Sequence, residues 1–190
     1  MPNAFSKVFV VILLVIMIIF IPVYQSYKAQ DDLAYQVAFQ AVTNFVDNVR
    51  MKGYISPQMV EDFESSLEIG SYLYKTEYVH QKKVYTPVYE DPTNPATFKD
   101  EYIVTKDEYF KSQILDYLYK EPNKKPKNDR KYLMTVGDTF NVNVENMTRT
   151  KASLLFDYLT GGNRGNGVVI SIPYGGMILN EDYVLGDDLE

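Results

Sequence analysis

An uncharged apolar run from Val8 to Tyr24 constrains this chain more than any other feature of its sequence. The run is 17 residues long, and its most polar side chain is a tyrosine. As an α-helix it would span about 25 Å, and with Phe5 and Tyr27 at its ends it reaches the roughly 30 Å of a bilayer's hydrocarbon core. The run therefore predicts a membrane anchor over residues 1–28. We assign its lipid contacts to Val8, Ile12, Val15, Ile19, Pro22 and Tyr24.

The alternative to a retained anchor is a signal peptide that is cleaved. The apolar part of a signal peptide is about 7 to 15 residues long and ends at a small-x-small site. Here the run is longer, and the nearby Ala29 has Tyr27 two places before it, which makes a poor cleavage site. The chain has no cysteine, so neither a lipoprotein anchor nor a disulfide framework is available. We therefore predict a retained anchor.

The flanking charges predict its orientation. Lys7 precedes the run, whereas Lys28 is followed at once by Asp31 and Asp32. Because basic residues stay on the cytoplasmic side of a membrane, we expect a cytoplasmic N-terminus and an extracytoplasmic C-terminal domain.

Residues 29–52 continue the pattern as an amphipathic helix. They contain no proline or glycine, and Gly53 follows where the helix would end. The apolar positions have helical spacing: Ala34, Val37, Ala38, Ala41, Val42, Phe45, Val46 and Val49. Two arrangements fit. Either one helix of about 65 Å runs from Val8 to Lys52, or the helix breaks near Gln25. We define residues 29–55 as the helical extension.

Residues 56–190 predict a small α+β domain with an antiparallel sheet. Its first half predicts a helix from an N-cap at Ser56 to Gly70, paired strands over 71–81 and 82–90 with a turn near 81–83, a loop over 91–101, and a helix from Thr105 to Tyr119. Pro87 lies inside a predicted strand, so we expect an edge position or a bulge there.

The second half of the domain contains shorter elements. The pattern predicts strands over 132–136 and 139–147 around a Gly-Asp turn, a helix over 151–159, a glycine-rich hinge over 162–167 and a last strand over 168–176. Between the halves, residues 120–131 carry six basic side chains and two prolines. This segment predicts a solvated loop, which is either a connector or an attachment point for an anionic surface.

No catalytic, cofactor-binding or metal-binding set is predicted. His80 is the only histidine, and we expect it to be a surface or half-buried residue. The glycine-rich segment 161–167 follows a helix and precedes a strand, which is the reverse of a phosphate loop, and the acidic pairs do not have EF-hand spacing. All 25 acidic residues but only 17 of the 19 basic ones follow residue 30, and this acidic balance disfavours nucleic acid as a partner.

The layout resembles type IV pilin-like proteins, in particular TadE-like minor pilins or pseudopilins of Gram-positive bacteria. A short polar leader, an apolar helix and the extension VAFQAVTNFVDNVRMKGYI carry the resemblance over about the first 70 residues. Such proteins carry glycine or alanine before a leader cut and a glutamate early in the mature helix. Ala4 matches the first feature, and the run from Val8 to Tyr24 has no glutamate.

The resemblance implies a structural, non-catalytic, single-pass subunit of a pilus-like or secretion-associated cell-surface assembly. Its partners would be the lipid bilayer and other pilin-like subunits or assembly-platform proteins. Small residues allow helices to approach closely, so we expect helix-to-helix contacts with neighbouring subunits at Ala34, Ala38, Ala41 and Phe45. The alternative function is a monomeric anchored binding module whose tyrosine-rich sheet recognises an extracellular ligand.

Overall fold

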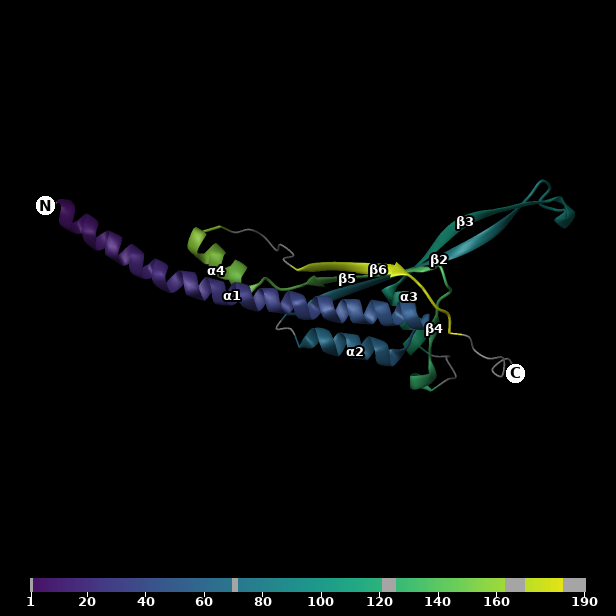
Figure 1. Ribbon diagram of the computed structural model, residues 1–190, viewed down its shortest axis with the longest axis horizontal. Helices are drawn as coiled ribbons and strands as arrows, with labels where there is room; N and C mark the ends of the chain where they lie inside the picture. Colours follow the sequence, from purple (N-terminus) through teal and green to yellow (C-terminus); the bar gives the residue numbers. More distant parts are fainter. Residues whose placement is uncertain (1, 70–71, 121–125, 163–169, 183–190) are drawn as a thin grey trace.

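The computed structural model describes residues 2–69, 72–120, 126–162 and 170–182. One long helix, α1 (Pro2–Lys52), runs along the molecule. Its C-terminal half lies against an antiparallel sheet and a second helix, and its N-terminal half projects away from them (Figure 1). The chain is therefore an α+β protein, as predicted.

The helix α1 is continuous, so the predicted break near Gln25 is wrong and the single-helix alternative is confirmed. Pro22 lies inside it without ending it. The helix ends at Gly53, whose N–H bonds the carbonyl of Val49 at 2.8 Å. Gly53 has φ +73°, and a Cβ there would lie 2.2 Å from the carbonyl oxygen of Asn180. Only glycine fits this turn without strain.

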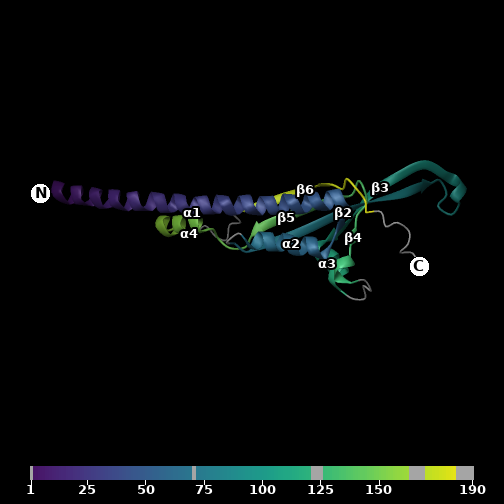
Figure 2. The same ribbon diagram turned by 60° about the horizontal axis from the view of Figure 1, so that its bottom comes forward.

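The second helix, α2 (Pro57–Glu68), starts as predicted. The Ser56 hydroxyl accepts a bond from the backbone N–H of Met59, and Pro57 occupies the first helical position. The short strand β1 (Tyr54–Ile55) joins α1 to α2 and pairs with β4 (Tyr132–Leu133). The two helices thus pack side by side, as both views show (Figures 1 and 2).

The main sheet has four antiparallel strands in the order β3-β2-β5-β6. Their bounds are Tyr74–Tyr89 for β2, Phe98–Phe110 for β3, Thr139–Asn146 for β5 and Ser171–Met177 for β6. The alternation predicted for β5 is confirmed, because Phe140, Val142 and Val144 are all buried. The bulge expected at Pro87 is also confirmed, since the register with β3 shifts between Pro87 and Tyr89.

Two predictions in this region are wrong. The turn near 81–83 is absent, because β2 runs straight through it and pairs with β3 on the far side. The first part of the helix predicted over Thr105 to Tyr119 is a strand instead, with Thr105 opposite Val84, and the rest of it is helical. Pairing with β2 overrides the local capping signal. Helix α3 (Lys111–Tyr119) begins later, where the Gln113 side chain accepts from the Phe110 N–H at 2.8 Å.

The remaining elements depart from prediction in smaller ways. The loop predicted over 91–101 ends early, at the short helix η1 (Pro95–Thr97). Strand β4 is two residues long and pairs with β1 rather than with β5, so the predicted Gly-Asp hairpin is wrong. Helix α4 (Lys151–Thr160) is confirmed, capped by Thr150 and ended by Gly161 at φ 61°. The predicted hinge after Gly162 and the start of the last predicted strand lie outside the described residues.

A single hydrophobic core joins the helical extension to the domain that follows it. Phe45 of α1 stacks on Phe63 of α2 with ring centroids 4.5 Å apart, and it also contacts Tyr78 and Phe140 of the sheet. Ala34, Ala38 and Ala41 are buried on the same face. The side chains that we assigned to contacts between subunits are therefore covered by this chain itself, and we no longer assign them to such contacts.

We expect Phe45→Ala in the full chain to lower the free energy of unfolding by about 3 to 5 kcal/mol, because it leaves a cavity among three other rings. The matched control is Phe39→Ala on the same helix, where the ring is 43% exposed. That variant should lose no more than about 1 kcal/mol. Chemical denaturation in mild detergent measures both, and equal losses would contradict the assignment of Phe45 to the core.

Candidate interaction surfaces

The first candidate surface is the N-terminal half of α1. Among the described residues, α1 is the one helix long and apolar enough to cross a membrane, and the rest of the chain buries none of its most apolar 18-residue window. The predicted anchor residues Val8, Ile12, Val15 and Ile19 are 51–63% exposed. Pro22 is exposed too, whereas Tyr24 is half-buried. The burial pattern is unlike that of a core helix in a water-soluble protein.

The second candidate surface is a two-stranded ribbon that we call the arm, residues 82–107. Strand β2 pairs with β5 only as far as Gln81, and beyond it β2 pairs with β3. The arm therefore leaves the four-stranded sheet and extends away from it, at the end of the molecule opposite the N-terminus (Figures 1 and 2). Sequence analysis missed the arm because it placed a turn and a helix where the two strands run.

One face of the arm is rich in aromatic side chains. Tyr85 lies opposite Val104 and Pro87 lies opposite Tyr102, so these four share a face. Further out, Tyr89 contacts Phe98, and Phe98 contacts Tyr102 with ring centroids 5.3 Å apart. Tyr85 is 60% exposed and Tyr102 is 57% exposed. This face offers apolar area with phenol hydroxyls, a combination suited to binding.

The tip of the arm is held by local hydrogen bonds. The Asp91 carboxylate accepts from the Thr93 N–H at 2.9 Å and from the Thr93 hydroxyl at 2.7 Å. These bonds favour the charged form and lower the pKa of Asp91. The Asn94 side chain caps η1 by accepting from the Ala96 N–H at 3.1 Å. The tip thus has a defined shape although it packs on no core.

A buried polar cluster lies at the base of the arm. His80 is 2% exposed and Asp138 is 1% exposed, so the expectation of a surface or half-buried histidine is wrong. His80 Nε2 lies 3.0 Å from Asp138 Oδ2, and His80 Nδ1 lies 2.8 Å from the Tyr132 hydroxyl. Asp138 also accepts from the backbone N–H groups of Lys83 and Thr135. The cluster therefore ties β2, where the arm begins, to β4 and to the turn before β5.

The chemistry of the cluster assigns its protons. Burial lowers the pKa of His80 in spite of the opposing effect of Asp138, so the ring is neutral. A neutral ring that faces a carboxylate donates from Nε2 and accepts at Nδ1, and the Tyr132 hydroxyl is then the donor. Burial, with Tyr109 and Asp138 nearby, raises the pKa of Tyr132, which keeps that hydroxyl protonated.

This arrangement holds the strands together, with the His80 ring buried among them. The groups bonded to His80 are a carboxylate and a phenol, and Tyr109 stacks on its ring. Within the described ranges, no three histidine, cysteine, aspartate or glutamate side chains gather as a metal site would require.

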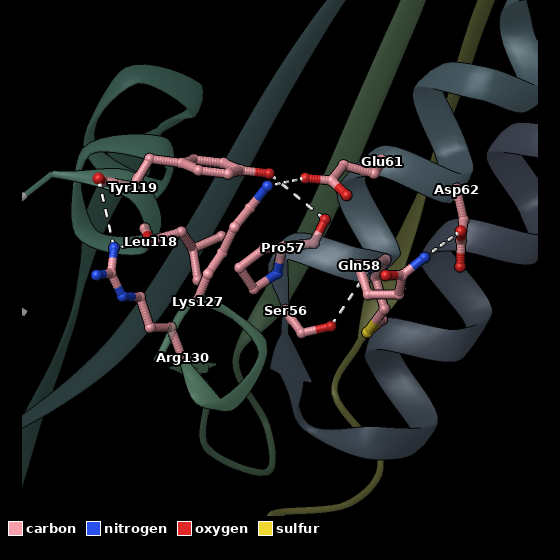
Figure 3. Close-up of polar contacts among 10 residues, drawn as sticks. Ser56, Pro57, Gln58, Glu61, Asp62, Leu118, Tyr119, Lys127 and Arg130 are labelled. Carbon is pink, nitrogen blue, oxygen red and sulfur yellow. Dashed lines mark hydrogen bonds and ion pairs between the residues drawn. The ribbon is translucent and has the colours of Figure 1, made fainter. Parts of the chain in front are cut away.

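The basic segment is tied to the chain's own acidic and carbonyl groups where the structure describes it. Lys127, in the short helix η2 (Lys127–Asp129), pairs with Glu61 of α2 and lies over the Tyr119 ring (Figure 3). Arg130 donates to the carbonyl of Leu118 at 3.1 Å. Lys120 pairs with Asp116, and Lys131 pairs with Asp182. These contacts favour the connector interpretation, with the segment leading from α3 to β4 and contacting α2 on the way.

Comparison with models of known protein families, with curated proteins and with solved structures found no match.

The neutral buried state of His80 predicts a pH dependence. In the unfolded chain, His80 binds a proton near the ordinary histidine pKa of about 6.5, whereas in the folded chain the pKa of His80 is lower. Stability should therefore be complete above that pH and should fall below it, by at most about 1.4 kcal/mol per pH unit. Urea titrations of the full chain between neutral and mildly acidic pH measure this slope.

The control is His80→Gln, which removes the only histidine in the chain. Its stability at neutral pH should be lower, because His80 bonds Asp138 and Tyr132, and it should lack the histidine part of the slope. If acid instead stabilised the native protein relative to this variant, the charge of Asp138 would outweigh burial and the proton assignment above would be wrong.

Proposed function

We propose that this protein is a structural, non-catalytic subunit of a pilus-like or secretion-associated cell-surface assembly, anchored by a single membrane span. One observation carries the proposal. The helix α1 is unbroken for 51 residues, with an uncovered apolar half and a half that forms the core of the folded domain.

The two halves of α1 suit two environments. The exposed half matches the thickness of a bilayer and would contact lipid tails in the anchored state. Because lipid tails and apolar side chains are similar solvents, the same surface could later exchange lipid for the helices of neighbouring subunits at little hydrophobic cost. A continuous helix also passes any rotation or shift of the anchor directly to the domain outside.

A long N-terminal helix that is free at one end and covered by an antiparallel sheet at the other supports the similarity to TadE-like and other pilin-like proteins. The contacts with neighbouring subunits are assigned to the outer face of α1, in place of the buried alanines. Leu33 is 61% exposed, and Tyr35 and Phe39, which stack on each other, are each 43% exposed. The partners would be subunits of the same class and the membrane platform that assembles them.

Photocrosslinking in intact cells tests the subunit proposal. A benzophenone amino acid at Leu33 should give a ladder of crosslinked products, and these products should stay in the membrane pellet after alkaline carbonate washing. The matched control position for the benzophenone amino acid is Tyr85 on the arm, which is 60% exposed. No crosslinks from Leu33, or release of the chain by carbonate, would contradict the proposal. A mature N-terminus beyond Tyr27 would do so as well.

The second candidate function is an anchored binding module, and the aromatic face of the arm favours it. The face is exposed and rich in tyrosine, and the arm that carries it is remote from the N-terminal half of α1 (Figure 1), so it could present a binding surface to an extracellular polymer or protein. In this case the photocrosslinker at Tyr85 would capture a partner, and the one at Leu33 would leave the chain monomeric.

Paired substitutions on the arm test this alternative. We expect Tyr85→Ser with Tyr102→Ser to reduce binding to isolated cell-wall material by tenfold or more, a loss of about 1.4 kcal/mol or more. The control pair is Thr86→Ala with Thr105→Ala, on the opposite face of the same ribbon. Equal binding by both pairs and the native protein would remove the arm as the binding surface.

A further inference from the structure

Helix α4 is an insertion between β5 and β6 that packs beside α1. Asn146 and Ile170 hold the two ends of this insertion together. The N–H of Asn146 donates to the Ile170 carbonyl at 3.0 Å, and the Ile170 N–H donates to the Asn146 side chain at 2.8 Å. From there α4 runs beside α1 on the side towards the N-terminus, as both views show (Figures 1 and 2).

The contacts of α4 place it at the end of the apolar run. Phe156 lies against Tyr24, with ring centroids 6.3 Å apart, and Tyr24 stacks on Phe20. Phe20, Tyr24 and Tyr27 are half-buried, whereas residues 4–19 are exposed. Four further residues of α4 follow Phe156, a length of about 6 Å, so the last turn of α4 reaches beside the apolar run itself.

The outer side of α4 is apolar at this level. Tyr158 is 86% exposed, Leu154 is 49% exposed and Leu159 is 48% exposed. The two charged residues of the helix are Lys151 and Asp157. Lys151 begins the helix at its distant end, and the Asp157 carboxylate pairs with Arg149 and is 11% exposed. The half of α4 nearest the apolar run therefore presents no unpaired charge.

We propose that α4 is a second membrane contact, which inserts Leu154, Tyr158 and Leu159 into the interfacial layer of the bilayer that α1 crosses. This inference rests on the proposed function, since it takes α1 as the span. A helix with exposed leucine and aromatic side chains is stable at the boundary between head groups and acyl chains, where a tyrosine keeps its hydroxyl in the wet layer. Two contacts with one membrane would fix the orientation of the domain above it.

The bilayer fits this surface better than a second copy of the chain does. The exposed side chains of α4 continue the apolar surface of α1 at the same level, so any bilayer that surrounds the end of the run also meets α4. The surface consists of three exposed apolar side chains, whereas an interface between two stable protein partners buries about 800 Å² on each side.

Tryptophan fluorescence tests the inference, because the chain contains no tryptophan. Three single variants of the full chain are placed in vesicles of phosphatidylethanolamine and phosphatidylglycerol, with and without lipids brominated high in their acyl chains. They are Tyr158→Trp on α4, Phe9→Trp on the apolar half of α1 and Tyr85→Trp on the arm. We expect brominated lipid to remove roughly half or more of the emission of the Tyr158→Trp variant. The Tyr85→Trp variant should be unaffected.

The outcomes separate this inference from the proposed function. Quenching of Phe9→Trp without quenching of Tyr158→Trp would overturn the inference and leave the anchor standing. Quenching of neither would overturn both. A blue-shifted Tyr158→Trp emission that bromine does not quench, and that is lost on dilution of protein in lipid, would assign the surface to a second copy and also overturn the inference. Leu159→Trp repeats the measurement at a neighbouring position.

Discussion

Packing of the C-terminal half of α1 under the sheet is the interaction on which the rest of the structure depends. Phe45 sits between α2 and the sheet, in contact with Phe63, Tyr78 and Phe140. The polar end of α1 holds the last strand as well, because Arg50 donates to the Met177 carbonyl at 3.0 Å and Asp47 accepts from the Tyr174 hydroxyl. The helix is both the centre of the folded domain and the connection to the apolar segment.

Because the sheet covers only the C-terminal half of α1, the two ends of the molecule have different surfaces. One end is an apolar helix with α4 beside it, and the other is a ribbon with an aromatic face. The buried His80 cluster lies between them and joins the base of the ribbon to the turn before β5. Such a polar cluster is stable in the interior because its donors and acceptors are matched, and it fixes the point at which the ribbon leaves the sheet.

The arrangement explains why a domain with a modest core keeps a long ribbon in place. A two-stranded ribbon is barely stable by itself in water. Here its strands continue directly into the sheet, and its outer end has its own contacts between Tyr89, Phe98 and Tyr102. The ribbon is therefore stiffened at both ends, which holds its aromatic face away from the four-stranded sheet.

The sequence by itself determined the features that depend on near neighbours in the chain. The apolar run, the helical spacing of residues 34–49, the cap at Ser56 and the alternation of β5 are all local patterns, and the structure has each element. Tertiary structure decided what depends on partners far apart in the sequence. Residues that carry a helix-capping signal form a strand because they pair with β2. The only histidine of the sequence is buried by the fold and bonds Asp138. The same packing buries the alanines of α1 within this chain. The sequence could not show this, because a stripe of small residues has the same pattern whether its own sheet or another subunit covers it.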